Sequence, residues 1–236
     1  MPPPNTGCLV MPRVLWITAF LRVDMSENLW PLRDSRQGSC SEDTTYSLDL
    51  HTFFMKSKLL GMVHADSSNF TEGVSKTAAY DQIIEAAKAL FDGQRNWVCN
   101  AANTASLIWH ALHALPSPSN KVNWAGFYVL DPSVPDQLIL APFQGKVACQ
   151  TITFGKGVCG AAAASQKTLL VPDVEKFPGH IACDGDSRSE IVVPILKDGK
   201  VVAIIDIDCA VESGFDEEDQ RKLEELAEIL SEGCDW

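Results

Sequence analysis

The chain lacks any long hydrophobic run. Its most apolar early stretch, residues 8–23, is interrupted by Pro12 and Arg13 and falls short of the roughly 20 apolar residues that span a bilayer. The same stretch has neither the basic start nor the small-residue cleavage site of a signal peptide. We therefore expect no membrane association and a cytoplasmic location.

Basic residues are also scarce. Lysine and arginine number 19 against 31 aspartates and glutamates, which gives a formal net charge of -12. Proteins that bind nucleic acid need clustered basic side chains to neutralise phosphates, so this charge balance argues against a nucleic-acid partner. Much of the acidity lies in residues 216–236, where we interpret it as the solvated face of a helix.

The eight cysteines form no CxxC redox motif and no paired CxxC zinc motif. A chain of 236 residues with 46% hydrophobic residues can build a core without disulfide staples. In a reducing compartment, clustered thiols more often serve catalysis or bind metal. The role of each cysteine therefore depends on the residues around it and not on the number of cysteines in the chain.

The sequence divides into two parts near residue 62. Residues 1–61 open with three prolines and continue through Ser-, Asp- and Arg-rich stretches without sustained periodicity. We predict that they form a disordered and dispensable extension. We predict that residues 62–236 form the folded domain.

Within the second part, helices alternate with short β-rich runs. Apolar spacing predicts one helix between Ser75 and Gly93, a second between Asn96 and Pro116 with Val98 on its apolar face, and a third over residues 216–231. Lys197-Asp198-Gly199-Lys200 is typical of a hairpin turn. Strands are predicted over residues 124–130, 137–141, 148–153, 168–171, 191–196 and 201–208. This order predicts an α+β domain with one antiparallel sheet.

Three cysteines, Cys149, Cys159 and Cys183, lie among glycines and polar residues where we expect reachable thiols. Cys159 precedes an alanine run, so it is predicted in the first turn of a helix, where the dipole favours a thiolate. Cys183 lies in a glycine-containing loop that could approach another sulfur. Two alternatives stay open: buried small hydrophobes, or a metal site that these three form with His180.

A second group of residues suits a small polar ligand. Asp206 and Asp208 lie two residues apart on one side of a predicted strand, and Glu190 opens the neighbouring strand. Trp124 and Tyr128 share a face of another strand. The carboxylates could bind a cation and the aromatic rings could wall an ammonium group. The simpler alternatives are an acidic strand end in water and ordinary core aromatics.

Six motifs carry a resemblance to a known family. They are NWAGFY at 123–128, FQGKVACQ at 143–150, GKGVCG at 155–160, PGHIACDG at 178–185, SEIVVP at 189–194 and IDIDC at 205–209. In order and spacing they closely resemble the free methionine-(R)-sulfoxide reductases, which are built on a GAF domain, an antiparallel sheet flanked by helices. The similarity covers about residues 62–236.

The resemblance implies reduction of free methionine (R)-sulfoxide, with no metal or organic cofactor and with thioredoxin as reductant. It implies that Cys183 is the nucleophile and Cys149 the principal resolving thiol, with Cys159 as an alternative partner or in an exchanged role. It also implies an acidic substrate site and an aromatic wall, formed by Glu190, Asp206, Asp208, Trp124 and Tyr128. A homodimer is an open alternative to a monomer. The competing interpretation is a non-catalytic GAF module that binds a small ligand.

Overall fold

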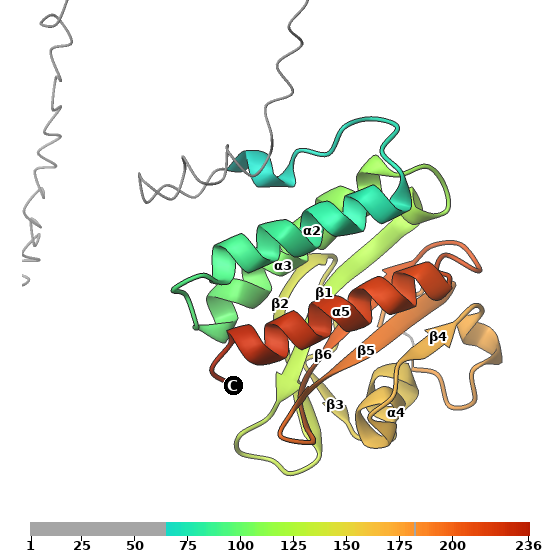
Figure 1. Cartoon of the computed structure of the whole chain (residues 1–236). Coiled ribbons are helices and arrows are strands. Elements are labelled where there is room, and N and C mark those ends of the chain that lie inside the picture. Colours follow the sequence, from blue (N-terminus) through green and yellow to red (C-terminus); the bar gives the residue numbers. More distant parts are fainter. Residues whose placement is uncertain (1–64, 182) are drawn as a thin grey trace, which may run out of the picture. The chain divides into compact units, whose positions relative to one another are not determined.

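A computed structural model describes residues 65–181 and 183–236; the predicted extension and its boundary at residue 62 lie outside this range. Six strands form one antiparallel sheet in the order β3-β2-β1-β6-β5-β4 (Figure 1). The strands are β1 Val122–Leu130, β2 Gln137–Gly145, β3 Thr151–Thr153, β4 Leu169–Val171, β5 Ser189–Lys197 and β6 Lys200–Cys209.

Helices cover both faces of this sheet. One face carries α2 (Lys76–Phe91), α3 (Trp97–Ala114) and α5 (Glu217–Gly233), and the opposite face carries α4 (Gly157–Ser165) (Figure 1). Three short 3-10 turns complete the described part, at Ala65–Ser68, Ser119–Lys121 and Val174–Lys176. The predicted α+β class with an antiparallel sheet is confirmed.

The long helices begin where the sequence offers capping side chains. Ser75 and Asn96 accept hydrogen bonds from the third residue of α2 and of α3. Asp216 caps α5 in a reciprocal capping box with Asp219. The expected hairpin turn joins β5 to β6 with positive φ at Asp198 and Gly199, as a two-residue type I′ turn requires.

Alternation along the strands divides the apolar residues into two cores. The larger core lies under α2, α3 and α5 and receives the odd-numbered residues of the central strands, such as Phe127 and Ile205. The smaller core lies under α4 and receives even-numbered residues, such as Tyr128 and Ile204. Odd- and even-numbered residues of the central strands thus lie on opposite faces of the sheet. The candidate functional residues of these strands lie on the face covered by α4.

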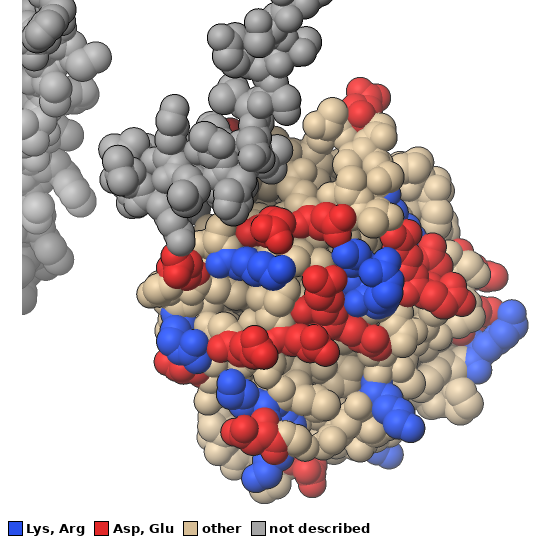
Figure 2. Space-filling view, in the orientation of Figure 1, with Lys and Arg blue, Asp and Glu red and all other residues tan. Residues whose placement is uncertain are grey.

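Acidic side chains gather over the helical face shown in Figure 2, with lysine and arginine side chains between them. Lys222 pairs with Asp81 at 2.6 Å, which links α5 to α2. Asp219 is fully buried and accepts a hydrogen bond from the Tyr80 hydroxyl, so the acidity of α5 is only partly a solvated face. In the described part of the chain, every helix is too short or too polar to cross a bilayer.

Two sequence predictions are wrong in detail. The strand expected over residues 148–153 begins only at Thr151, because residues 148–150 leave the sheet in the loop that carries Cys149. Val98 was expected on the apolar face of α3 but is 46% exposed. It lies in the first turn of the helix, beyond the area that the sheet covers.

Candidate active site

Strand pairing places the acidic residues predicted from the sequence side by side on the α4 face. Strands β5 and β6 pair so that Glu190 lies opposite Asp208. Strand β1 sets Trp124 opposite Asp208 and Gly126 opposite Asp206 on the other side of β6. Because alternate residues of a strand share a face, the three carboxylates project from the same side of the sheet. The predicted acidic cluster is therefore present.

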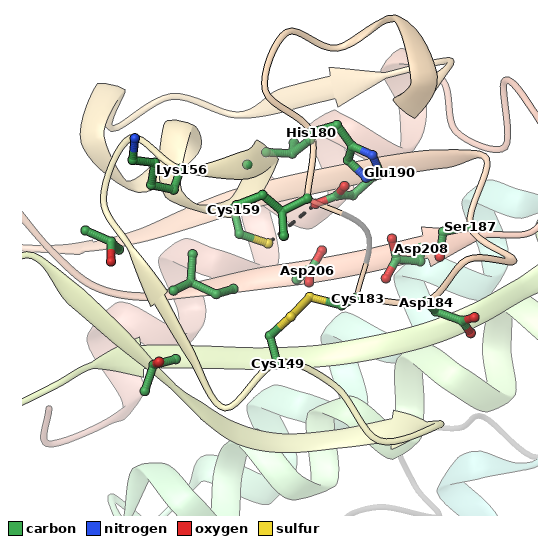
Figure 3. A pocket seen from close by; sticks show the side chains of 16 residues that line it. Cys149, Lys156, Cys159, His180, Cys183, Asp184, Ser187, Glu190, Asp206 and Asp208 are labelled. Atoms are coloured by element: carbon green, nitrogen blue, oxygen red, sulfur yellow. Dashed lines mark hydrogen bonds between the residues drawn. A yellow bond between two sulfur atoms is a disulfide. The ribbon is translucent and has the colours of Figure 1, made fainter.

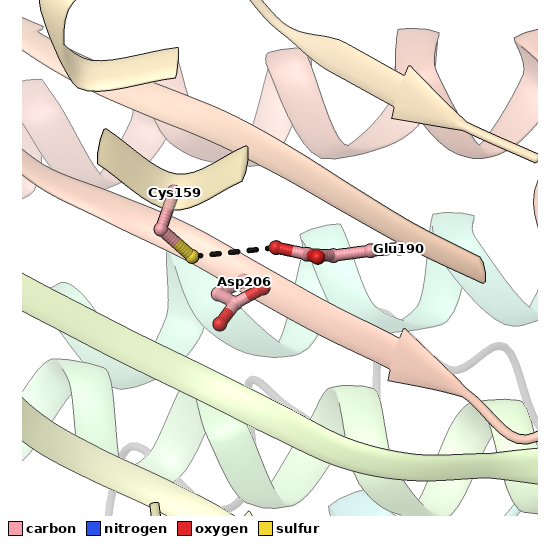
Figure 4. Close-up of side chains that lie close together, drawn as sticks. All are labelled: Cys159, Glu190 and Asp206. Carbon is pink, nitrogen blue, oxygen red and sulfur yellow. Dashed lines mark hydrogen bonds between the residues drawn. The ribbon is translucent and has the colours of Figure 1, made fainter. Parts of the chain in front are cut away.

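Helix α4 brings Cys159 to these carboxylates. Cys159 is the third residue of α4, as predicted, and its Sγ donates a hydrogen bond to Glu190 Oε1 at 3.4 Å. Asp206 lies against this pair (Figure 4). A Cβ at Gly160 would overlap the Thr153 carbonyl of β3, so only glycine lets α4 approach the sheet this closely.

A disulfide joins Cys149 to Cys183, which are 34 positions apart in sequence and have Cα atoms 5.7 Å apart. The bond connects the loop after β2 to the loop before β5. Lys146 links the same two loops, with Nζ 2.6 Å from Asp186 and 3.4 Å from Asp184. Cys183 is exposed and Cys149 half-buried, so another thiol can reach this bond.

The three cysteines and the three acidic residues of the cluster line one cavity of about 210 Å³ (Figure 3). This volume is smaller than the roughly 300–1,000 Å³ typical of pockets for drug-sized ligands, and it suits a ligand of amino-acid size. Sequence reasoning missed several polar lining residues, which lie within or beside the recognised motifs but carry no pattern of their own. They are Thr151, Thr153, Lys156, Asp184 and Ser187.

Three carboxylates of the cavity, those of Glu190, Asp206 and Asp208, resist ionisation. Burial raises the pKa of Asp206 to about 6. Burial, followed by the charges of Asp206 and Asp208, raises the pKa of Glu190 well above its usual range. The pKa of Asp208 is raised by burial and then by the charge of Asp206. Among the ion pairs of the described residues, none includes these three groups. The cavity is therefore suited to hold a cation or a proton.

The prediction that the α4 dipole favours a Cys159 thiolate is wrong. The side chain is 7% exposed, and burial raises the pKa of its thiol well above the usual range, with further contributions from Asp206 and Glu190. The half charge at a helix N-terminus is outweighed by desolvation together with two adjacent carboxylates. Cys159 is therefore a neutral hydrogen-bond donor at the wall of the cavity.

Trp124 and Tyr128 lie behind the cavity and are not among its lining residues. Their rings stack with centroids 5.8 Å apart, and Trp124 also stacks on Phe143 at 5.2 Å. Gly126 makes this possible, because a Cβ there would overlap both Phe143 and the Trp124 ring. In this oxidised form the two residues are part of the smaller core, and their contact with a ligand remains a prediction.

The alternative metal site of three cysteines and His180 is not assembled in this form. Cys149 and Cys183 are bonded to each other, which removes two of the four sulfur and nitrogen ligands. His180 lines the cavity, and burial lowers the pKa of its imidazole.

The fold and the site together define a class of protein, the GAF domain. The GAF domain family model matches residues 101–233. A solved GAF-domain structure superimposes with a TM-score of 0.71 at 51% identity, covering 75% of this chain and 98% of the other.

Proteins of similar sequence identify the family within the GAF class. The free methionine-R-sulfoxide reductase of Saccharomyces cerevisiae is 53% identical over 175 residues, which cover 74% of this chain and 96% of the relative. The Escherichia coli enzyme of the same name is 39% identical, with 66% and 89% covered. The Neisseria meningitidis enzyme, solved in complex with its substrate, has 40% identity, a TM-score of 0.63 and coverage of 70% and 95%. The chain belongs to the family of free methionine-R-sulfoxide reductases, as its motifs predicted.

Proposed function

We propose that this protein reduces free L-methionine (R)-sulfoxide to L-methionine. The observation that carries the proposal is a reachable disulfide, Cys149–Cys183, on the wall of an acidic cavity of amino-acid size. Relatives that carry the reductase name support the same substrate. A non-catalytic ligand-binding GAF module, the competing hypothesis, would have no use for two cysteines that meet at the cavity.

In the proposed reaction Cys183 is the nucleophile. Its thiolate attacks the sulfoxide sulfur, the S–O bond breaks, and methionine leaves with two electrons gained while the oxygen stays on Cys183 as a sulfenic acid. Cys149 then attacks the sulfenic sulfur, expels water and forms the disulfide. Exposure of Cys183 supports this role, and the raised pKa of the Cys159 thiol argues against exchanged roles.

The carboxylates serve the substrate in two ways. Asp206 and Asp208 hold the ammonium group of the free amino acid, which a methionine inside a polypeptide lacks. Glu190, whose pKa burial raises well above its usual range, donates a proton to the sulfoxide oxygen as the S–O bond of the substrate breaks. Trp124 and Tyr128 form the aromatic wall once the cavity opens to the smaller core.

Thioredoxin is the proposed reductant. A dithiol that exchanges with the Cys149–Cys183 disulfide restores both thiols and leaves as a disulfide itself. Because this cycle needs a reducing compartment, the proposal includes a cytoplasmic location. The oligomeric state, monomer or homodimer, is measured by light scattering of the reduced and the oxidised protein.

The test supplies the purified protein with thioredoxin, its reductase and NADPH, and offers each methionine sulfoxide epimer separately. We expect turnover of the free R epimer, and far slower turnover of the S epimer and of N-acetylated methionine sulfoxide. Cys183→Ser is the control for thiol dependence. Equal turnover of both epimers would contradict the specificity, and no turnover of any would favour the non-catalytic module.

A further inference from the structure

Cys159, Glu190 and Asp206 converge on one point from α4, β5 and β6 (Figure 4). A sulfur of the first and an oxygen of each carboxylate all lie within 4.8 Å of one another. The three residues are only 6–7% exposed. The proposed reduction uses the two carboxylates for the substrate but assigns no role to the sulfur of Cys159.

The distance between Cys159 Sγ and Glu190 Oε1 matches that of two ligands in tetrahedral zinc coordination. Bonds of about 2.3 Å to sulfur and about 2.0 Å to oxygen, at a tetrahedral angle, separate the two ligand atoms by about 3.5 Å. Cys159 Sγ and Glu190 Oε1 are 3.4 Å apart. A cation can therefore sit between them without any large movement of α4 or β5.

One ligand atom of the cluster is also unsatisfied. Asp206 Oδ1 is buried and has no hydrogen-bond partner, although its carboxylate lines the cavity. A buried oxygen without a partner costs free energy, which a bound cation would recover. No Lys or Arg of the described residues pairs with Glu190 or Asp206. A bound cation would therefore not have to displace a positively charged side chain from these carboxylates.

We propose that Cys159, Glu190 and Asp206 form an inhibitory site for a thiophilic divalent cation, with Zn²⁺ as the best match. One thiolate with two carboxylates suits zinc, whereas Mg²⁺ and Ca²⁺ take oxygen ligands alone. Three protein ligands leave a fourth position on the cavity side for water. The thiol proton of Cys159 and the proton held by Glu190 are released to solvent as the sulfur and the carboxylate bind the metal.

The consequence for activity rests on the proposed function. Zn²⁺ at this point would occupy Asp206, one of the two carboxylates that receive the substrate ammonium, and Glu190, the proposed proton donor, so the metal should compete with methionine sulfoxide. The site does not use Cys149 or Cys183, so it persists when these two are joined in the disulfide. Metal binding can therefore be measured on the oxidised protein, without any turnover.

The direct experiment uses the full chain, oxidised so that Cys149 and Cys183 are paired. Zn²⁺ is titrated by calorimetry, and Co²⁺ is used as a spectroscopic probe whose thiolate charge-transfer band reports a bound sulfur. Wild type should bind one equivalent more than Cys159→Ser and should show a charge-transfer band that this variant loses. Asp206→Asn, which keeps the sulfur, should weaken Zn²⁺ binding at least about 10-fold.

The matched control is Cys99→Ser, which removes an exposed cysteine far from the cavity and should keep the full stoichiometry. Equal binding by wild type, Cys159→Ser and Asp206→Asn would overturn the proposal. If Cys159→Ser does not fold, as judged by circular dichroism, Asp206→Asn alone decides between the outcomes. Zinc that binds with these signatures but leaves the KM for methionine sulfoxide unchanged would uphold metal binding, but it would overturn the inhibitory role and the placement of the substrate ammonium.

Discussion

Cys183 and Cys159 line the same cavity in opposite surroundings. Cys183 lies exposed in a loop and is bonded to Cys149, whereas Cys159 is buried in α4 against Glu190 and Asp206. The first is open to exchange with another thiol. The second is held by packing and by a hydrogen bond that requires its proton.

The difference shows that proximity to a helix N-terminus does not by itself make a reactive thiol. Desolvation and two neighbouring carboxylates raise the pKa of the Cys159 thiol, so the thiolate is scarce near neutral pH. Solvent access at Cys183 lets a reductant reach the disulfide. The same acidic groups that suppress the Cys159 thiolate also make the cavity attractive to cations.

The largest expected effect separates the two cysteines. Cys183→Ser should abolish turnover and release no methionine even in one round, because a hydroxyl is a far poorer nucleophile than a thiolate. Cys159→Ser should still release up to one equivalent of methionine from the reduced protein. The measurement is single-round methionine release by chromatography. A round of reduction that survives in Cys183→Ser but not in Cys159→Ser would reverse the two roles.

Cys149→Ser should show what happens without the resolving thiol. We expect one equivalent of methionine and then a protein stalled as the sulfenic acid of Cys183, because the buried Cys159 is poorly placed to resolve it. Mass spectrometry after trapping with a sulfenic-acid reagent locates the added oxygen. A disulfide between Cys159 and Cys183 in this variant would show that α4 can release Cys159.

Substitutions of the cavity carboxylates should have the next largest effect on activity. Asp206→Asn removes a buried charge, and Glu190→Gln removes a proton donor. A hydrogen bond to a charged group contributes roughly 1.5–3 kcal/mol, so each substitution should change the affected kinetic constant by about 10- to 150-fold. Asp206→Asn should act mainly on KM, and Glu190→Gln mainly on kcat. Steady-state kinetics with the free R epimer measure both. Unchanged constants in both variants would place the substrate elsewhere.

A smaller effect on turnover is expected from substitution of the exposed apolar side chains beside the disulfide. Val147 is 88% exposed two residues before Cys149, and Ile181 is 55% exposed two residues before Cys183. If thioredoxin packs on these side chains, Val147→Ser should slow thioredoxin-supported turnover by roughly five-fold, equivalent to about 1 kcal/mol of apolar contact.

Two controls make this prediction specific to docking. Turnover supported by dithiothreitol, which needs no docking surface, should stay the same in Val147→Ser. Val134→Ser changes an exposed valine at the other end of β2 and should leave both reductants equally effective. Equal losses with thioredoxin and dithiothreitol would show that Val147 acts on the chemistry instead.

The smallest expected effect is on stability. Burial raises the pKa of Asp206 from 3.8 to about 6, so the folded state holds a proton that the unfolded state has lost. Ionisation of Asp206 therefore costs stability as the pH rises from about 4 through 6, and the loss is complete above that pH. Asp206→Asn should raise Tm at pH 8, by about 2–4 °C for each kcal/mol recovered, and should have little effect near pH 4.

The control for stability is Asp136→Asn, the same chemical change at an exposed turn residue with positive φ, which asparagine tolerates. Its Tm should match wild type at both pH values. A lower Tm for Asp206→Asn at pH 8 would show that the charge of Asp206 is compensated in the folded protein.

Much of the fold and the site follows from local pattern. The alternation of IDIDC predicts that Asp206 and Asp208 share a face, and strand pairing brings Glu190 opposite Asp208. The helices were predictable because Ser75, Asn96 and Asp216 are capping residues ahead of apolar repeats. The order and spacing of the motifs were enough to identify the family.

The sequence by itself therefore determined the residue types, their order and the faces on which they lie, since these depend on neighbours within a few positions. Only the tertiary structure decided that Cys149 bonds to Cys183, that Cys159 is buried and neutral, and that Trp124 stacks behind the cavity. The physical reason is that burial, pKa and pairing depend on groups that are distant in sequence. Cys159 meets Glu190 and Asp206 only after α4 packs on β5 and β6.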